Sequence, residues 1–546
     1  MIRARKPIVL VIGAVLLLTG VLSSCTREEE GGATRTTLRV GWSSEPDKLN
    51  PITSYSTEGH EVMALVYDKL VEYDTSLQAQ PGLAESWTYS DDGLDITYNL
   101  RSGVTWHDGV PFTSADAKYT FDTIHEYELG EYSQWLVDMT DVETPDDTTL
   151  IIRFSRPQAF NPGLAIPILP EHVWGGMSKD EIRKFQNETP IGTGPYTFTE
   201  WKGGESLTIE RNADWWGDPP AAQRIVYVLY SNEDVMSQAL RAGEIDILTE
   251  VPPTIWDGLQ GVENVKAVSL PSFSFHHIGF NVDTDPASLG NPLLLDPVIR
   301  QALNYAIDRS QLVELALAGH GQPGSVLIPP ALGDWQLQIP PEQQMNADPD
   351  KANQMLEDAG YTDTDGDGVR EASDGSPLEF RLIAIESTTV DVRAAELFVD
   401  AAAVVGIKLD LQTMDENTLG NTVYNTKDPD WDIFVWGWDS GVADPDYMLG
   451  IVLCSQIGGN NDVFYCDKQY DALYTKQATT VDQGARVPII DQMQQMFYES
   501  GVYIVMWYQD KLQAYRTDTW ENWTETPGGM VYNFTRDNYL QITPVA

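Results

Sequence analysis

The sequence predicts a mixed α/β protein built from more than one lobe. At about 150 residues per domain, its 546 residues correspond to roughly two to four domains or lobes. Strand-like and helix-like segments alternate along the chain, with no internal repeat and no low-complexity block. This interleaving is typical of α/β lobes, and the apolar fraction of 42% is enough to build large cores.

The N-terminus has the pattern of a secretory signal peptide over residues 1–25. Basic residues precede an apolar run at 8–21, which is shorter than the roughly 20 residues that span a bilayer. The tetrad 22–25 resembles the lipobox of bacterial lipoproteins, in which the cysteine is diacylated and becomes the first mature residue. We therefore expect a lipid anchor on Cys25, a flexible tether over 26–36 and an extracytoplasmic location. The alternative is an uncleaved anchor helix.

The charge of the chain is strongly acidic. Asp and Glu number 82 against 34 Lys and Arg, a formal net charge of −48. Such a surface repels nucleic acid and anionic lipid, so we expect no nucleic-acid partner. No second long apolar run follows the signal peptide, so the mature chain is expected to be soluble. A high-salt or acidic habitat is one explanation of the charge and is left open.

The first predicted elements are a strand at 38–42 and two helices. Thr113 is a predicted N-cap with Asp116 three residues later, the pattern of a capping box at a helix start. A long amphipathic helix is predicted over 297–318, with proline at its first position and Gly319 at its end.

The later elements continue the α/β pattern. A helix is predicted over 349–359, where alanine, methionine and leucine recur on one face. Segments with strand-like apolar patterns follow at 378–385, 408–414, 431–438 and 503–508.

Two cysteines remain besides Cys25. Cys454 and Cys466 form an even pair in a chain expected outside the cytoplasm, where disulfides persist. The residues between them are rich in Gly, Asn and Asp, as in a turn-rich loop. We expect a disulfide between them, worth roughly 3 kcal/mol in the chain-entropy model. The alternative is two free thiols.

Familiar catalytic signatures are missing from the sequence. It contains no G-x-S-x-G, no H-E-x-x-H and no phosphate-binding glycine loop with Lys and Ser/Thr. His276 and His277 are the only close histidine pair, and they lie in a pattern typical of a strand. These absences disfavour an enzyme without excluding one, and we assign no catalytic residue.

An acidic segment begins as a calcium loop begins. Asp363, Asp365 and Asp367 occupy positions 1, 3 and 5 of a D-x-D-x-D-G pattern, and Gly follows at position 6. Glu371 is at position 9 and Asp374 at position 12, where a longer Glu is usual. The pattern allows a structural Ca²⁺ held by the three aspartates and Asp374. The alternative is a plain acidic turn, and no other cofactor is required.

The most unusual segment is 431–439, with three Trp and two Asp in nine residues. Strand alternation puts Trp436 and Trp438 on one side, and Asp439 and Asp444 follow at the strand end. Burial of these indoles in a core is one interpretation. The other is the lip of a cleft, where indoles stack on a ligand and a carboxylate meets a cation.

Several motifs, in this order and spacing, resemble the peptide- and nickel-type solute-binding proteins of ABC importers (extracellular family 5). The resemblance runs over nearly the whole mature chain. The segments that carry it are the opening loop at 43–51, W-x-D-G-x-P-x-T-x-x-D at 106–116, G-T-G-P-Y at 192–196, R-N with W-W at 211–216, the helix-turn-strand at 240–246, and 280–281 with 299–309.

The resemblance implies a two-lobed periplasmic-binding-protein-like fold of type II, in the large peptide-binding class. Lobe one would comprise residues 37–272 and 511–546, and lobe two residues 273–510. Two chain crossings would form a hinge, and the lobes would close over a ligand in the cleft between them. The cysteine pair of the family near this strand resembles Cys454 and Cys466.

The function implied is the extracytoplasmic binding component of an ABC importer. It would be a monomer that captures oligopeptides or dipeptides and delivers them to a membrane permease. Peptide-binding members pair the peptide amine with an Asp three residues after the tryptophan, where this chain has Gly441, so Asp439 is the expected substitute. The predicted ligand-binding residues are Ser44, Glu45, Pro46, Trp436, Gly437, Trp438, Asp439 and Asp444.

Other readings remain open at this point. The same transport role for an oligosaccharide would use the many Trp as stacking platforms, and a cationic small molecule would suit the acidic lip. A sensor lobe without import and an extracytoplasmic hydrolase are the more remote alternatives.

Overall fold

The computed structural model describes residues 35–230, 232–531 and 536–545. The predicted signal peptide, Cys25 and all but the last two residues of the predicted tether lie outside these ranges. Among the residues described, no helix is both long and apolar enough to cross a bilayer.

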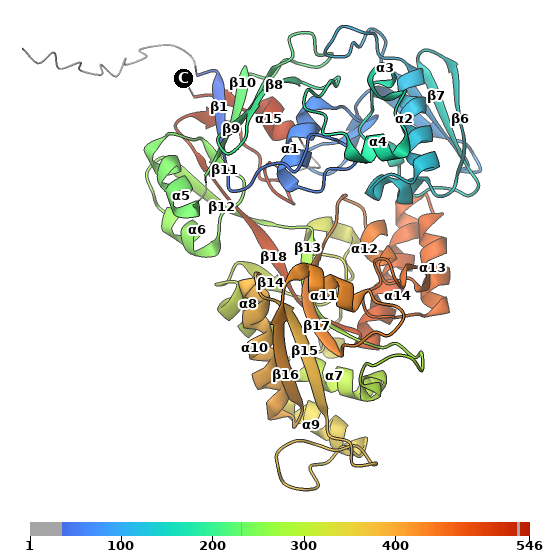
Figure 1. Cartoon of the computed structure of the whole chain (residues 1–546), viewed down its shortest axis with the longest axis vertical. Helices are drawn as coiled ribbons and strands as arrows, with labels where there is room; N and C mark the ends of the chain where they lie inside the picture. The colour runs from blue at the N-terminus through green and yellow to red at the C-terminus, as the bar shows by residue number, and fades with distance from the viewer. Residues whose placement is uncertain (1–34, 231, 532–535, 546) are drawn as a thin grey trace, which may run out of the picture.

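The described chain forms two lobes joined by one long strand, β18 (Tyr503–Arg516), as Figure 1 shows. We call residues 35–271 and 510–545 the first lobe, the upper one in Figure 1, and residues 274–509 the second lobe. The first half of β18 pairs within the second lobe and its second half within the first. One strand therefore belongs to the sheets of both lobes.

The main sheet of the first lobe has the order β8-β9-β10-β1-β11-β18, and β12 pairs with β18. Its strands are β1 (Thr37–Trp42), β8 (Tyr196–Lys202), β9 (Ser206–Arg211), β10 (Arg224–Leu229), β11 (Ile247–Leu248) and β12 (Val265–Pro271). The helices of this lobe are α1 (Thr57–Val66), α2 (Ser114–Tyr127), α3 (Glu171–Trp174), α4 (Lys179–Lys184), α5 (Glu233–Ala242), α6 (Pro253–Leu259) and α15 (Asp537–Gln541).

Smaller sheets complete the first lobe. A four-stranded sheet has the order β4-β5-β7-β6, with β4 (Ala84–Tyr89), β5 (Asp95–Leu100), β6 (Met139–Asp146) and β7 (Thr149–Phe154). Helix α2 packs on β6 and β7 of this sheet. Two-stranded pairs are formed by β2 (Val71–Tyr73) with β3 (Ala79–Pro81) and by β19 (Trp520–Glu521) with β20 (Thr543–Pro544).

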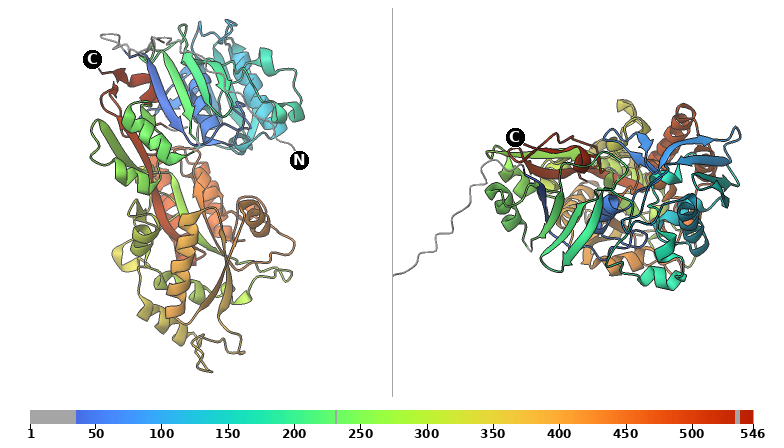
Figure 2. Two further views of the ribbon diagram at one scale, coloured as in Figure 1. Left: turned by 60° about the vertical axis from the view of Figure 1, so that its left-hand side comes forward. Right: turned by 90° about the horizontal axis from the view of Figure 1, so that it is seen from above.

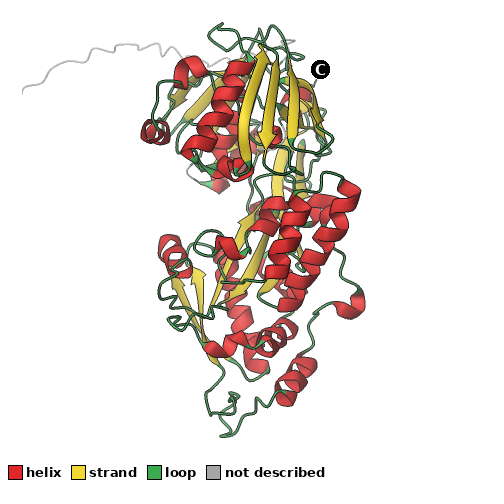
Figure 3. Ribbon diagram, turned by 90° about the vertical axis from the view of Figure 1, so that its right-hand side faces the viewer, coloured by secondary structure: helices red, strands yellow, loops and turns green. Residues whose placement is uncertain are grey.

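The sheet of the second lobe has the order β16-β15-β17-β13-β18, and β14 also pairs with β18. Its strands are β13 (Ser274–Phe280), β14 (Gly321–Pro323), β15 (Glu379–Ile385), β16 (Lys408–Met414) and β17 (Ile433–Asp439). Its helices are α7 (Pro297–Ala306), α8 (Arg309–Ala316), α9 (Pro349–Asp358), α10 (Thr389–Val404), α11 (Glu416–Val423), α12 (Asp446–Gly450), α13 (Lys468–Ala478) and α14 (Gln483–Ser500). Figure 3 shows helices gathered along one side of this lobe.

The chain passes between the lobes twice. Strand β12 pairs with β18 as far as Pro271 opposite Asp510, and β13 begins at Ser274 in the other lobe. Strand β14 pairs Gly321 with Gln509, so the partners of β18 change between residues 509 and 510. The crossings therefore lie side by side, where the two lobes meet in Figure 2.

Local sequence signals account for most element boundaries. Helix α2 starts with a capping box, in which the Thr113 side chain accepts from the backbone and Asp116 accepts from Thr113 N at 3.0 Å. The single helix predicted over 297–318 is wrong. It divides into α7 and α8, because Asp308 caps a new start by accepting from Ser310 N and Gln311 N.

The second lobe has its own apolar core between the sheet and helices α7 and α10. Ile278, Leu303, Leu382, Phe398 and Met506 contribute to it, and all five are fully buried. Strand β17 contributes Ile433 and Val435 to this core and buries Phe434 in the other large core, while its last four residues are half-buried or exposed. The end of β17 is therefore held by a rigid sheet but is open on one side.

Candidate functional site

A cavity of about 1030 Å³ lies between the two lobes, beside the two crossings. Residues 272–274 and 509–511 at the crossings contribute to its lining, together with side chains from both lobes. A cavity of this size is at the upper end of the range for small-molecule sites, which cluster at roughly 300–1,000 Å³. Relative movement of the lobes about the crossings would change its volume directly.

The end of β17 forms the wall of the cavity on the second lobe. Trp436, Gly437, Trp438 and Asp439, which were predicted to contact the ligand, all line the cavity. Both indoles are half-buried, and both N–H groups donate to the same Asp462 carboxylate oxygen, at 2.8 Å from Trp436 and 3.0 Å from Trp438. The two indoles thus lie on the same side of the strand.

Gly437 allows β17 to approach His276 on the neighbouring strand β13. The two residues are paired in the sheet, and a Cβ at position 437 would lie 2.9 Å from the nearest atoms of the His276 ring. His276 also stacks on Trp507, with ring centroids 5.4 Å apart. The glycine is therefore needed for packing within the cavity wall.

His276 adds a charged pair to the same wall. Its Nδ1 lies 2.7 Å from Oδ1 of the buried Asp391, and both residues line the cavity. Burial alone lowers the pKa of His276, but the Asp391 carboxylate outweighs it and Asp439 adds to it, so the pKa is raised. This wall therefore offers carboxylates and an imidazole close together, in addition to the indoles.

The opposite wall, from the first lobe, is mainly aromatic and apolar. Tyr55, Tyr67, Tyr132 and Trp135 line it, and Tyr55 is 83% exposed. Lys69, a half-buried cation of this wall, donates to Leu164 O at 3.2 Å, and desolvation lowers the pKa of its amine.

Ser44, Glu45 and Pro46 do not line the cavity. The Glu45 carboxylate accepts from Trp201 Nε1 at 3.0 Å and from Gly204 N at 2.8 Å, so it ties the loop after β1 to the β8–β9 turn. Pro46 is buried, and the Ser44 hydroxyl donates to Glu58. The geometry gives these three predicted residues a local structural contact and none with the cavity.

Asp444, which was also predicted to contact the ligand, does not line the cavity. Its carboxylate receives two hydrogen bonds of 2.7 Å from Arg486 on α14, and the pair is buried. Burial, and then the Asp444 charge, raise the pKa of Tyr73 in the first lobe. Nearby, Ala159 N of the first lobe donates to Ala478 O of the second at 2.9 Å. Asp444 therefore belongs to a buried ion pair within the second lobe, close to a backbone hydrogen bond between the lobes.

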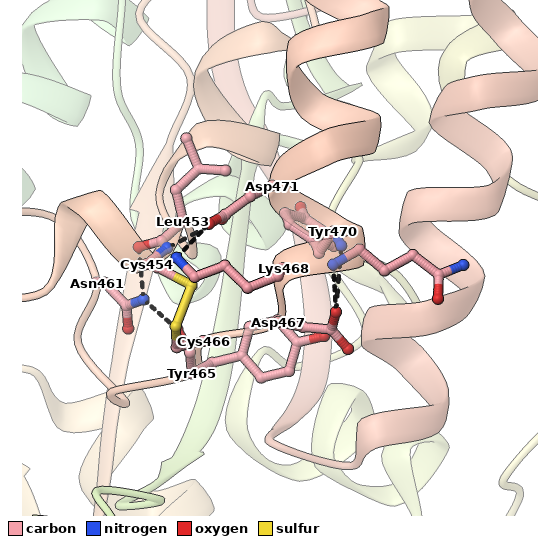
Figure 4. The surroundings of a disulfide bond; sticks show 10 residues. Leu453, Cys454, Asn461, Tyr465, Cys466, Asp467, Lys468, Tyr470 and Asp471 are labelled. Atoms are coloured by element: carbon pink, nitrogen blue, oxygen red, sulfur yellow. Dashed lines mark hydrogen bonds and ion pairs between the residues drawn. A yellow bond between two sulfur atoms is a disulfide. The ribbon is translucent and has the colours of Figure 1, made fainter.

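The predicted disulfide between Cys454 and Cys466 is present, as Figure 4 shows. It closes the loop that carries Asp462. Inside this closure, the Asn461 side chain donates to Leu453 O at 3.0 Å and to Tyr465 O at 2.7 Å (Figure 4). Both ends of the loop are therefore joined by a covalent bond and by one amide.

The acidic segment after α9 brings four carboxylates together, but not the four that we predicted. Asp363, Asp365, Asp367 and Glu371 offer oxygens that all lie within 4.8 Å of one another. Asp374 is not in this group, and its carboxylate instead accepts from the Ser376 backbone at 3.0 Å. Oxygen ligands of this kind suit Ca²⁺, with Glu371 replacing Asp374, and bound calcium stays a prediction.

Sequence reasoning missed three contributors to this site. Asp462 was hidden within a turn-rich loop, and Asp391 stands near the start of α10 with no local motif. His276 was noted only as a strand residue, although its place opposite the glycine of W-G-W was a usable signal once the strands were paired.

Comparison with known proteins identifies the class of protein that this fold and cavity define. Residues 78–460 match the model of bacterial extracellular solute-binding proteins, family 5. The match covers well over half of the chain, and the protein belongs to this family.

The relatives include proteins with named solutes. The oligopeptide-binding protein AppA of Bacillus subtilis is 26% identical over 98% of this chain and 99% of its own length. Its structure with a nonapeptide has a TM-score of 0.75, at 25% identity over 93% of this chain and 99% of that one. The glutathione-binding protein GsiB of Escherichia coli is 25% identical over 92% of this chain and 93% of its own. The protein CtaP of Listeria monocytogenes, at 23% identity and a TM-score of 0.79 over 94% of this chain and 100% of that one, shares the fold.

Proposed function

We propose that this protein captures oligopeptides or dipeptides outside the cytoplasm and delivers them to an ABC-type membrane permease. The observation that carries the proposal is the cavity lined from both lobes beside a double crossing, in a chain that belongs to the extracellular solute-binding proteins. A solute that contacts both walls favours the closed form, which is what a permease can recognise. The peptide class rests on relatives such as AppA, whose name states oligopeptide binding.

The cavity wall formed by the second lobe suggests how a peptide would be held. Asp439 would meet the ammonium group, and the imidazolium of His276 would meet a carboxylate or a carbonyl oxygen of the same solute. Trp436 and Trp438 would contact apolar portions. Binding requires no bond to be made or broken, and we propose no chemical step.

A second candidate is an oligosaccharide or a cationic small molecule carried by the same transport route. Aromatic side chains from both lobes favour a sugar, because indole and phenol faces stack on pyranose rings. The carboxylates of Asp439 and Glu416 in the lining favour a cation. Under either candidate the hinge and the permease have the same role.

The anchor and assembly complete the proposal. Cys25 would carry the lipid that keeps the mature protein at the membrane surface, and the residues after it would act as a tether. The protein would act as a monomer, with the permease as its macromolecular partner.

Native mass spectrometry of the purified mature protein tests the proposal. Solute that leaves on denaturation is then identified by its mass and fragmentation. A ladder of small peptides is the expected result. A single sugar or other solute would replace the peptide class and keep the transport role. Absence of binding to a peptide pool added afterwards would contradict the peptide class.

A further inference from the structure

We infer that Asp462 is a positioning residue, which holds Trp436 and Trp438 in the orientation that the cavity wall requires. The inference rests on the proposed function, because it assigns the two indoles to solute contact. Asp462 itself does not line the cavity, and its carboxylate is fully buried behind the wall.

Three hydrogen-bond donors converge on this one carboxylate, and a histidine lies close to it. Its Oδ2 accepts from Trp436 Nε1 at 2.8 Å and Trp438 Nε1 at 3.0 Å, and its Oδ1 accepts from the Tyr503 hydroxyl. His277 Nε2 lies 3.4 Å from Oδ2. A single buried acceptor shared by two indoles couples their positions, since neither can turn without losing its hydrogen bond.

The charge of Asp462 is balanced by hydrogen bonds more than by a cation. Among the described ion pairs its partner is His277, and burial lowers the pKa of that imidazole. The hydrogen bonds from the two indoles and the phenol are the closer contacts of the carboxylate, since the imidazole nitrogen lies 3.4 Å away. The indole N–H groups supply the hydrogen bonds that the buried Asp462 carboxylate needs, and the same bonds fix the orientation of the indoles.

The loop that carries Asp462 is restrained on both sides of the residue. Asn461 links the two ends of the loop next to the disulfide, and Val463 O accepts from Val282 N at 3.1 Å. A turn-rich segment of this kind would otherwise be mobile. The closure therefore keeps the carboxylate at a constant place under β17.

The two indoles also pack against other aromatic side chains of the cavity wall. Trp436 packs on Tyr424, with ring centroids 5.4 Å apart, and Trp438 packs on Tyr447 at 6.3 Å. Both tyrosines line the cavity. Asp462 thus sets the arrangement of an aromatic array of four rings from behind, and specificity for apolar side chains of the solute follows from it.

The first test needs no solute. The two indole N–H resonances of ¹⁵N-tryptophan-labelled protein are assigned with W436F and W438F, and then compared in D462N. We expect both resonances to move upfield, because the amide replaces a shared anionic acceptor. The matched control is D432N, since Asp432 is also a buried carboxylate of the second lobe and accepts from Asn291 N and Arg381 outside the cavity. It should leave both resonances in place.

The second test measures binding with a defined probe, a random tripeptide pool whose retained members are quantified by mass spectrometry. We expect D462N to retain at most about a tenth of the wild-type amount, with the largest loss for peptides that contain an aromatic residue. D432N should retain the wild-type amount. D462E, which keeps the charge on a longer side chain, is the second variant if D462N does not fold, and it should shift both indole resonances.

Unchanged indole resonances in D462N or D462E would overturn the positioning role. Shifted resonances with unchanged retention would overturn its consequence for solute binding. If the wild-type protein retains no tripeptide, the proposed peptide function fails, while the indole spectra still decide whether Asp462 positions the two rings.

Discussion

Asp439 is the last residue of strand β17 and Asp444 follows it by five residues in the turn before α12, and the protein uses them differently. Asp439 is exposed and lines the cavity beside His276. Asp444 is buried against Arg486, which lies 42 residues further along the chain. One aspartate thus faces the cavity between the lobes, and the other forms a buried ion pair within the second lobe.

The difference shows that a carboxylate is assigned to its role by its partners and its burial. An exposed acid is solvated and can exchange water for a solute cation at modest cost. A buried acid needs its cation permanently, because an unpaired charge in the interior is strongly destabilising. Substitutions at the buried ion pair should therefore change stability, and substitution of the exposed aspartate should change binding.

The largest effect is expected for R486M. Removing the guanidinium leaves Asp444 buried without its cation, so the free energy of unfolding should fall by about 3–5 kcal/mol. Denaturant unfolding measures the loss. Arg393, which pairs with Glu396 on the surface, provides the control R393M, expected to cost under about 1 kcal/mol. Equal stability of the two variants would contradict the assigned role of the pair.

Glu61 extends the comparison to a buried carboxylate held by neutral donors. It accepts from Trp42 Nε1 at 2.9 Å and from the Tyr539 hydroxyl, and burial raises its pKa from 4.5 to about 7. The folded protein therefore holds this proton more tightly than the unfolded chain. The stability from this group is present below about pH 4.5 and is lost as pH rises through about 7.

E61Q should accordingly gain stability relative to the wild type as pH rises. The difference in free energy of unfolding between E61Q and the wild type should grow by about 2–3 kcal/mol between pH 5 and pH 8, since one pKa unit corresponds to about 1.4 kcal/mol. Denaturant unfolding of both proteins at several pH values measures it. A gap that does not depend on pH would show that Glu61 ionises normally in the folded protein.

D439N should affect binding and leave stability alone. We expect retention of peptide to fall about tenfold to a hundredfold, or about 1.4–2.7 kcal/mol, through loss of the charge contact. Unfolding should change by less than about 0.5 kcal/mol, as for other exposed substitutions. Asp410, exposed on the edge strand β16, supplies the control D410N. Wild-type affinity in D439N would exclude the charge contact.

The acidic segment after α9 differs from both aspartates, because it gathers four carboxylates in one place. We expect a smaller effect on stability there. Millimolar Ca²⁺ should raise the melting temperature by about 1–3 °C through binding to the folded state. D365A should abolish the shift and D374A should retain it, because Asp374 lies outside the cluster. The opposite pattern would favour the ligand set expected from sequence alone.

The smallest effect is expected for E45Q. Glu45 was predicted to share the ligand with Asp439, but it accepts hydrogen bonds from Trp201 and Gly204 away from the cavity. Glutamine keeps an acceptor oxygen, so peptide affinity should stay within about twofold, under about 0.5 kcal/mol. A loss as large as that of D439N would return Glu45 to the binding site.

Local patterns determined much of the secondary structure. The capping box at Thr113, the strand at 408–414 and the cysteine pair were all predictable, because each depends on neighbours in sequence or on composition. The break between α7 and α8 was missed although Asp308 carried a usable N-cap signal, because an apolar face continued across it.

The length of strand β18 could not be predicted from local sequence patterns. Its apolar beginning at 503–508 was predicted, but the strand continues to Arg516, because its second half pairs with β12 in the other lobe. That continuation depends on a partner about 240 residues away in sequence, which no local propensity encodes.

The sequence by itself determined the α/β class and the family resemblance, because these follow from the order of the motifs and from the alternation of strand-like and helix-like segments. Only the tertiary structure decided that Asp444 pairs with Arg486, that Asp462 accepts from both indoles and that Glu371, not Asp374, lies with the three aspartates. The physical reason is the same in each case. Hydrogen bonds and ion pairs depend on distances of about 3 Å between groups that the fold brings together, and sequence spacing does not measure those distances.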